Sequence, residues 1–213
     1  MQIIKPRVHL RLETDAITIL KNIEYCGRLC YKSEHKITKD SYKTFIENII
    51  KRNHLSVIEH GKCTAIVVCD RGVSHEIVRH RIGSYSQEST RYVNYQDGIE
   101  FVEPIFWRND IAKMEIWKQA MLECEERYKA LIGLLCKPEE ARAILPNSLK
   151  TEIAITYNFR EWRHFLSIRG ASSAHIQIRE VAILLLQEFH KYMPVMFDDF
   201  IIDEKNMTIK RQI

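Results

Sequence analysis

The sequence lacks several features that mark common classes of protein. It has no run of about 18 apolar residues, so no membrane-spanning helix is expected. Its formal net charge is only +4, and a nucleic-acid-binding surface usually needs a much stronger basic stripe. The N-terminus has no apolar block with a small-residue cleavage site, so no secretory signal is expected. We therefore expect a cytoplasmic protein that binds neither a membrane nor nucleic acid.

Cysteine is present, but in no pattern typical of a metal or redox site. The six cysteines include no Cys-x-x-Cys pair, which argues against a zinc ribbon and a thioredoxin-like motif. Cys26 and Cys30 are four residues apart on an expected helix, yet no histidine or cysteine lies nearby at ligand spacing. In a reducing compartment such thiols usually serve as small buried apolar side chains. We expect no metal site.

The chain does contain enough apolar sequence for a sizeable core. Of its 213 residues, 46% are hydrophobic and 28% are charged, and no repeat or flexible linker interrupts them. We expect one domain over residues 1–213. Hydrophobic periodicity and capping residues predict the following elements. Strands are expected at 2–12, 62–69, 92–95 and 151–157, and helices at 14–31, 38–50, 110–136, 158–168 and 173–193, with short helices from 73 and 138.

These elements do not alternate as repeated βαβ units. The order favours an α+β fold, an antiparallel sheet flanked by long helices. The helix over 110–136 carries apolar residues at alternating gaps of three and four, as in a coiled coil. Those residues are Met114, Trp117, Met121, Cys124, Tyr128, Leu131 and Leu135. The seam predicts packing on another helix, within the subunit or across an oligomer interface, and ordinary core packing is the simpler interpretation.

The stretch from Arg79 to Tyr92 carries the clearest sign of chemistry. It combines three arginines and a histidine with four hydroxyl residues, and such groups bind phosphate oxygens well. Gly83 can turn the backbone or let it approach a ligand closely. Side chains 79–81 would point about 100° apart on a regular helix, so they serve two ligands or the helix unwinds there. A solvated basic loop and a nucleotide phosphate cradle are both compatible with this composition.

One pattern in this stretch resembles a family signature. Arg79-His80-Arg81, followed after seven residues by Ser89 and then by Arg91-Tyr92, is similar to the motif of the flavin-dependent thymidylate synthases. The resemblance implies methylation of dUMP to dTMP, with FAD as cofactor and with NADPH and 5,10-methylenetetrahydrofolate as co-substrates. It also implies a homotetramer with active sites at subunit junctions.

Further segments resemble the family in the same order over roughly residues 54–180. They are His54-x-Ser56-x-x-Glu59-His60, the segment around Arg142, Asn158 to Arg169, and Ala174-His175-x-Gln177-Ile178-Arg179. Each also has a purely structural interpretation, as a polar loop or an amphipathic helix, and we expect a structural role for the last segment.

The resemblance implies a role for each matched residue. Arg169 would be catalytic, because it matches the arginine that holds the uracil ring. The cofactor-binding residues would be Ser56, Arg79, His80, Arg81, Gln87, Asn158, Arg160 and His164. The substrate-binding residues would be Glu76, Arg79, Gln87, Glu88, Ser89, Arg91, Arg142 and Arg169. Glu76 stands where many members have glutamine, and Gln87 precedes Glu88 where others have glutamate first. A carboxylate at position 76 would repel a phosphate unless it were paired.

The cysteines bear on the mechanism. None follows a proline or precedes a histidine, so the Pro-Cys-His nucleophile of the covalent thymidylate synthases has no counterpart. An arginine can instead stabilise charge that develops on the uracil ring. Two other functions remain open at this point: a nucleic-acid-binding module that uses the loop from Arg79 to Arg91, and a flavoprotein that kept the fold without the methyl transfer.

Overall fold

The protein is described by a computed structural model over residues 1–212. The chain forms two compact units, each built from segments that are far apart in the sequence. Unit 1 consists of residues 1–7, 67–79 and 85–153. Unit 2 consists of residues 8–66, 80–84 and 154–212. The expectation that residues 1–213 act as one domain stays a prediction.

The largest sheet is antiparallel and has four strands in the order β2-β3-β6-β4. The strands are β2 (Arg7–Arg11), β3 (Lys62–Asp70), β6 (Lys150–Asn158) and β4 (Ser84–Gln87). Long helices lie between and after these strands in the sequence, and the mixture of helices with an antiparallel sheet confirms the α+β class. The expectations for 62–69 and 151–157 are confirmed, since β3 and β6 match them closely.

Two expectations about strands are wrong. Residues 2–12 form β1 (Gln2–Ile4) and β2 rather than one strand, because Pro6 between them has no N–H to donate to a ladder. Residues 92–95 form no strand: Tyr92 ends a turn, and the amides of Tyr92 and Val93 donate to the carbonyl oxygen of Ser89. The strand β4 was not expected, since its short polar sequence carries no apolar alternation.

Unit 1 is organised by β1 and by its long helix. β1 pairs in parallel with β5 (Glu100–Val102). Its helices are α3 (Arg71–Ile77), η3 (Ile105–Trp107), α4 (Ile111–Gly133), α5 (Pro138–Ala141) and η4 (Arg142–Ile144). None of the helices in residues 1–212 combines the length and the apolar character needed to cross a membrane.

The seam of α4 faces the core of unit 1. Trp117, Met121 and Tyr128 are buried against a cluster that includes Phe101. The core-packing interpretation of the seam is therefore confirmed for these residues. Leu135 does not belong to it, because α4 has ended before this residue and its side chain is 91% exposed.

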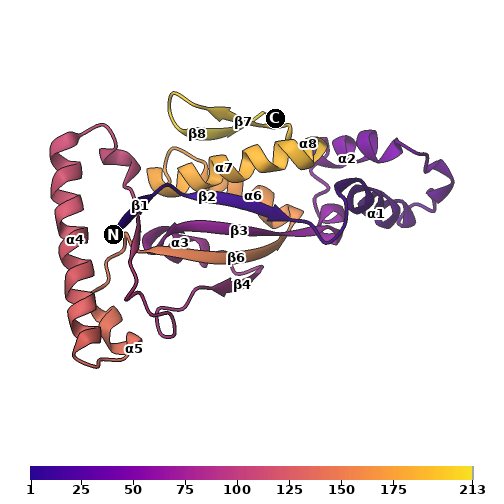
Figure 1. The fold of residues 1–213 in the computed structure, drawn as a ribbon. Coiled ribbons are helices and arrows are strands. Elements are labelled where there is room, and N and C mark those ends of the chain that lie inside the picture. The colour runs from indigo at the N-terminus through magenta and orange to yellow at the C-terminus, as the bar shows by residue number, and fades with distance from the viewer. Residues whose placement is uncertain (213) are drawn as a thin grey trace. The chain divides into compact units, whose positions relative to one another are not determined.

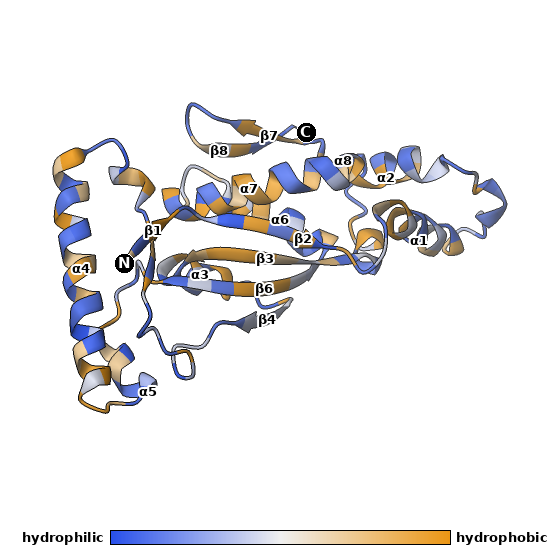
Figure 2. Ribbon diagram, in the orientation of Figure 1, coloured by the Kyte–Doolittle hydropathy of each residue, from blue (hydrophilic) through white to orange (hydrophobic). Residues whose placement is uncertain are grey.

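Unit 2 contains most of β2, the start of β3 and the end of β6. Its other elements are α1 (Ala16–Leu29), η1 (Glu34–Lys36), α2 (Ser41–Lys51), η2 (Val57–His60), α6 (Phe159–Arg169), α7 (Ile176–Tyr192), α8 (Pro194–Phe197), β7 (Phe200–Asp203) and β8 (Thr208–Arg211). Figure 1 shows α6 and α7 close together, and the two helices are in direct contact. Figure 2 shows hydrophobic segments between hydrophilic ones along α7, whose buried side chains include Val181, Leu185 and Phe189.

Helix α6 is held firmly at its start and along its buried face. Asn158 caps it, because its side-chain oxygen accepts from the amide of Glu161 at 2.9 Å. Trp162 is fully buried and donates its indole N–H to the carbonyl oxygen of Cys63 in β3 at 3.2 Å. The helix that carries Arg160, His164 and Arg169 is thereby fixed to the sheet.

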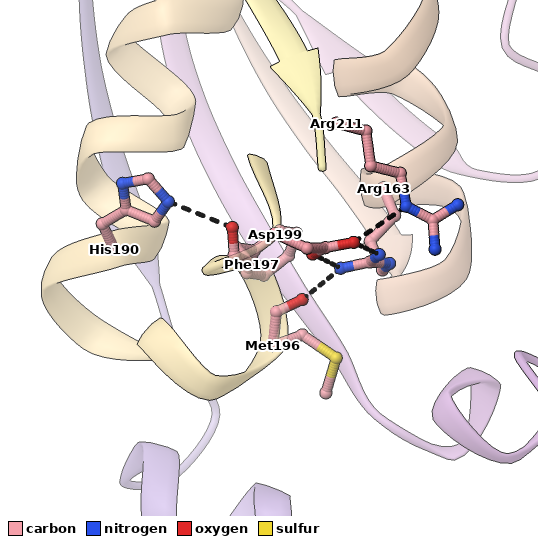
Figure 3. A network of polar contacts seen from close by, with 6 residues as sticks. All are labelled: Arg163, His190, Met196, Phe197, Asp199 and Arg211. Atoms are coloured by element: carbon pink, nitrogen blue, oxygen red, sulfur yellow. Dashed lines mark hydrogen bonds and ion pairs between the residues drawn. The ribbon is translucent and has the colours of Figure 1, made fainter. Parts of the chain in front are cut away.

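The C-terminal hairpin is tied to α6 by a buried arginine. Arg163 donates to both carboxylate oxygens of Asp199 and to the carbonyl oxygen of Met196, as Figure 3 shows. Arg211 adds a further contact to the Asp199 carboxylate at 2.8 Å. Burial disfavours the ionised carboxyl, but the hydrogen bonds and charges of both arginines outweigh it and lower the pKa of Asp199.

Candidate active site

The Arg79-His80-Arg81 triplet lies just after α3. The helix ends at Ile77 and does not extend through the triplet. Of the two expectations for this segment, the end of the regular helix is therefore the one observed. Arg79 and Arg81 are exposed, whereas the side chain of His80 is buried. Within residues 1–212 neither arginine side chain has a hydrogen-bond or ion-pair partner. The middle residue of the motif therefore turns inward and its neighbours face solvent.

In unit 2, His80 meets two residues of α6. Its Nδ1 lies 2.8 Å from Oε1 of Glu161, and its Nε2 accepts from Nε of Arg169 at 3.1 Å. Glu161 is 8% exposed and His80 is 7% exposed, so both contacts are shielded from water. We call Glu161, His80 and Arg169 the polar triad. It joins the predicted catalytic arginine to a predicted cofactor-binding histidine.

The surroundings of His80 favour its neutral form. Burial lowers the pKa of His80 most, and electrostatic interactions with Arg169 and His164 lower it further. The hydrogen bond and charge of Glu161 act in the opposite direction but do not reverse the shift. The rings of Phe165 and Tyr157 lie 5.0 Å and 6.2 Å from the imidazole.

Three other residues matched to the flavin line one hollow in unit 2. A cavity of about 530 Å³ is bordered by Asn158, Arg160 and His164. Arg160 and His164 are exposed, and Arg160 pairs with Glu59, which also lines this hollow. The imidazole of His164 lies 5.7 Å from that of His80, so the hollow borders the polar triad.

Two further residues of the expected cofactor set occur in unit 2. Ser56 is exposed at the start of η2, next to Leu55, which lines the same hollow. Arg81 is exposed beside Ile82, which also lines it. The structure thus brings Asn158, Arg160 and His164 to the wall of the hollow itself and places Ser56 and Arg81 in adjoining positions of the chain.

The residues matched to the nucleotide gather mainly in unit 1. Nη1 of Arg142 donates to the hydroxyl of Thr90 at 3.3 Å. The hydroxyl of Ser89 accepts from the amide of Arg91, and Nε of Arg91 donates to Glu139 at 2.8 Å. The hydrogen bond and charge of Arg91 lower the pKa of Glu139. Two arginines and two hydroxyls are therefore close together on one side of unit 1, which suits a phosphate.

Gln87 and Glu88 are engaged by residues of unit 1. The amide nitrogen of Gln87 donates to the hydroxyls of Ser74 and Thr151. Glu88 accepts from the hydroxyl of Tyr95 at 2.7 Å and from the ammonium group of Lys150 at 2.9 Å. Both side chains are thereby held in one orientation.

Glu76 and Arg79 complete the matched set in unit 1. Glu76 is half-buried in α3, and the exposed Arg79 follows it by one helical turn. The backbone amide of Arg79 donates to the carbonyl oxygen of Glu76 at 3.3 Å. Glu76, which stands where many family members have glutamine, therefore lies in the same short segment as Arg79.

Ligand atoms of His80, Glu161 and His164 lie within 4.8 Å of one another, a spacing that a metal ion could use. Both ring nitrogens of His80 are, however, already in hydrogen bonds. The guanidinium of Arg169 would also repel a cation next to this ring. We keep the prediction that no metal binds here.

Sequence reasoning missed Glu161 and Glu139 as parts of the two clusters. The sequence Asn158-x-x-Glu161 is typical of a helix start, and that is the only signal Glu161 gave. Glu139 follows Pro138 in the first turn of a short helix and gave no other signal.

Comparisons with known proteins agree in the family that they indicate. The family described as "Thymidylate synthase complementing protein" matches residues 14–195. A flavin-dependent thymidylate synthase of Geobacter sulfurreducens is 35% identical over 185 residues, which cover 83% of this chain and 80% of that protein. One of Pyrococcus abyssi is 35% identical, over 86% of this chain and 77% of that protein.

A solved structure has the same fold. The UMP/dUMP methylase PolB of Streptomyces cacaoi, bound with 5-Br dUMP, superposes with a TM-score of 0.75. The match covers 93% of this chain and 96% of that one, at 23% identity. At this identity the likeness shows the fold.

Proposed function

Because the chain belongs to the flavin-dependent thymidylate synthase family, we propose that it methylates dUMP to dTMP with FAD as its cofactor. The carbon would come from 5,10-methylenetetrahydrofolate and the reducing equivalents from NADPH. The observation that carries the proposal is the meeting in unit 2 of the motif's His80 with Arg169, beside the hollow bordered by Asn158, Arg160 and His164.

The residues of unit 2 fit an anionic, aromatic cofactor. Arg160 and the exposed Arg81 carry positive charge that suits a pyrophosphate, and His164 and Asn158 add polar atoms at the wall of the hollow. Ser56 would add a hydroxyl. When bound, FAD would pass a hydride from NADPH to the transferred one-carbon unit. The protein would hold and orient this cofactor.

The residues of unit 1 would hold the nucleotide. Arg91 and Arg142 would bind its phosphate together with the Ser89 hydroxyl, because a guanidinium group can donate two parallel hydrogen bonds to a phosphate. Gln87 and Glu88, already held by Ser74 and Lys150, would offer fixed polar atoms. We assign Arg79 and Glu76 to the same ligand.

Arg169 would act on the uracil ring. A guanidinium stays protonated at any working pH and can stabilise negative charge that develops when the ring loses its proton. No thiol is needed for this step. Burial raises the pKa of Cys63 to about 12 and also raises the pKa of Cys69, so neither is a thiolate at neutral pH.

We further propose that the protein is a cytoplasmic homotetramer with active sites at subunit junctions. The support is that members of the family form homotetramers of this kind. Sedimentation of the purified holoprotein measures the assembly, and a monomer that retains full turnover would contradict it.

The proposal is tested by flavin content and by turnover. We expect a yellow protein that absorbs near about 450 nm, as protein-bound flavins do. We also expect release of tritium from dUMP labelled at C5, in a reaction that depends on NADPH and on the folate. A colourless protein that FAD cannot reconstitute contradicts the proposal. Steeply salt-dependent binding of DNA or RNA would favour the nucleic-acid module instead.

A substitution separates this enzyme from a flavoprotein without methyl transfer. In Arg169→Ala we expect flavin to be retained and turnover to fall by about 100-fold or more, because one electrostatic stabiliser is lost. Equal turnover in Arg169→Ala and the wild type refutes the role given to Arg169. Flavin binding without any turnover in the wild type indicates the inactive flavoprotein.

A further inference from the structure

The polar triad of unit 2 has a defined direction of hydrogen bonding. The carboxylate of Glu161 only accepts hydrogen bonds, so Nδ1 of His80 must carry the proton in their 2.8 Å contact. The guanidinium of Arg169 only donates, so Nε2 of His80 must offer a lone pair to Nε at 3.1 Å. A single neutral tautomer of His80 satisfies both partners at once.

The protonated imidazole does not fit this arrangement. A second proton would place an N–H of His80 against the N–H of Arg169 and break their hydrogen bond. The charged groups that face His80 are Glu161 and Arg169, and the titratable ring of His164 also comes from α6; the phenol of Tyr157 from β6 lies near the ring. Burial and the guanidinium of Arg169 favour the neutral ring, as the lowered pKa of His80 indicates.

The triad links the two ends of one helix. Glu161 lies in the first turn of α6, where Asn158 caps the helix, and Arg169 is its last residue. His80 comes from a different part of the chain and bridges them. Arg169 is half-buried, so its long side chain loses much of its freedom when His80 holds Nε.

We propose that Glu161 and His80 are positioning residues for Arg169: Glu161 selects the tautomer of His80, and His80 in turn fixes the plane of the guanidinium. This inference rests on the proposed function, because it presumes that Arg169 acts on the substrate ring. It adds Glu161 to the site, and it gives His80 a role toward the arginine in addition to the one expected toward the flavin.

The first experiment needs no turnover. Histidine labelled with ¹⁵N in the full-length chain reports which ring nitrogen of His80 is protonated, with His80→Gln to assign the signal. We expect the Nδ1–H tautomer at neutral pH in the wild type and a mixture of tautomers in Glu161→Ala. Protonation at Nε2 in the wild type overturns the proposal.

The second experiment uses the reconstituted enzyme and Glu161→Gln, which keeps a hydrogen-bonding group but loses the charge. We expect kcat to fall by up to about 100-fold with a much smaller change in KM for dUMP, because the arginine is misplaced rather than absent. Glu161→Ala should lose more. The acid limb of the pH–rate profile should move to lower pH, since the charge that raises the pKa of His80 is gone.

A matched control is Glu188→Gln in α7. Glu188 pairs with Lys191 of the same helix at 4.0 Å, so it offers a carboxylate whose ion-pair partner is not a member of the triad. We expect unchanged kcat and pH profile, and thermal melts of both variants should show folded protein. An unchanged kcat and acid limb in Glu161→Gln overturns the proposal. An inactive wild type that shows the expected tautomer contradicts the proposed function and leaves the geometry of the triad supported.

Discussion

Gly83 lies so close to Tyr157 that only a glycine fits. A Cβ at position 83 would stand 2.2 Å from two carbon atoms of the tyrosine ring. The same atom would lie 3.1 Å from the carbonyl oxygen of Thr156. Tyr157 is fully buried against Trp162, with ring centroids 4.5 Å apart, so it cannot move aside easily. Gly83 thus keeps the segment after the Arg-His-Arg triplet in place against β6.

We expect Gly83→Ala to lower the free energy of unfolding by about 1–3 kcal/mol, because the added methyl group overpacks a buried contact. Thermal and urea denaturation measure this change. Gly133→Ala is the control, since a Cβ there meets nothing within 4 Å, and it should leave stability unchanged or slightly higher. Equal stability in the two variants would show that the ring of Tyr157 moves freely.

The Arg91–Glu139 pair predicts competition with the nucleotide. Arg91 holds Glu139 at 2.8 Å and lowers the pKa of that carboxyl, so Glu139 is ionised throughout the neutral range. A phosphate at Arg91 must share the guanidinium with this carboxylate. We therefore expect Glu139→Gln to lower the Kd for dUMP several-fold, as measured by titration calorimetry.

The control for this prediction is Glu126→Gln. Glu126 is an exposed residue of α4, and it should leave the Kd unchanged. A weaker affinity in Glu139→Gln would mean that the carboxylate orients Arg91 for the ligand instead of competing for it.

Because Arg163 is buried, we expect the stability of the folded protein to depend strongly on Asp199. Asp199→Ala would leave Arg163, a residue that is 3% exposed, without its bidentate partner, so we expect a loss of about 3 kcal/mol in the free energy of unfolding. Urea denaturation at neutral pH measures it. Asp203→Asn, which removes an exposed pair with Lys210, should change stability much less. Similar losses in both variants would contradict the role of the buried network.

The same pair predicts acid sensitivity. The folded-state pKa of Asp199 is below its ordinary value, so the stabilisation is present above the unfolded pKa of about 3.9 and is lost as the pH falls through the folded pKa. The wild type should therefore lose stability on acidification more steeply than Asp199→Ala. Parallel acid-denaturation curves would argue against an ionised Asp199.

The thiols predict resistance to alkylation. Cys30 is exposed, whereas Cys63 and Cys69 are buried and burial raises the pKa of both. Iodoacetamide should modify Cys30 in the folded protein and leave turnover intact, and it should reach Cys63 and Cys69 only after unfolding. Mass spectrometry of the labelled protein, read beside the activity of Cys30→Ser, checks this. Alkylation of Cys63 or Cys69 in the folded protein as fast as that of Cys30 would contradict this prediction.

Local signals in the sequence were enough for most helices. The sequence offers Thr14 or Asp15 as the cap of α1 and Asn158 as the cap of α6, and the structure uses Asp15 and Asn158. Such caps can be predicted because a side-chain oxygen beside an apolar periodic segment is a local feature. The seam of α4 was likewise visible from its spacing, although its partner was not. Pro6 divides an expected strand into β1 and β2. The two strands pair with different partners, β5 and β3, and nothing in the sequence indicated these partners. The hairpin of β7 and β8 carried too little periodicity to be expected.

The sequence by itself determined the family signature, the types of the candidate groups and the helix that carries Arg169. Only the tertiary structure decided which partner each group has. Glu161 and His80 are 81 positions apart, and Arg169 and His80 are 89 apart, so no local pattern could pair them. Hydrogen bonds form between atoms a few ångströms apart in space, and for residues so distant in the chain that proximity exists only once the core has packed.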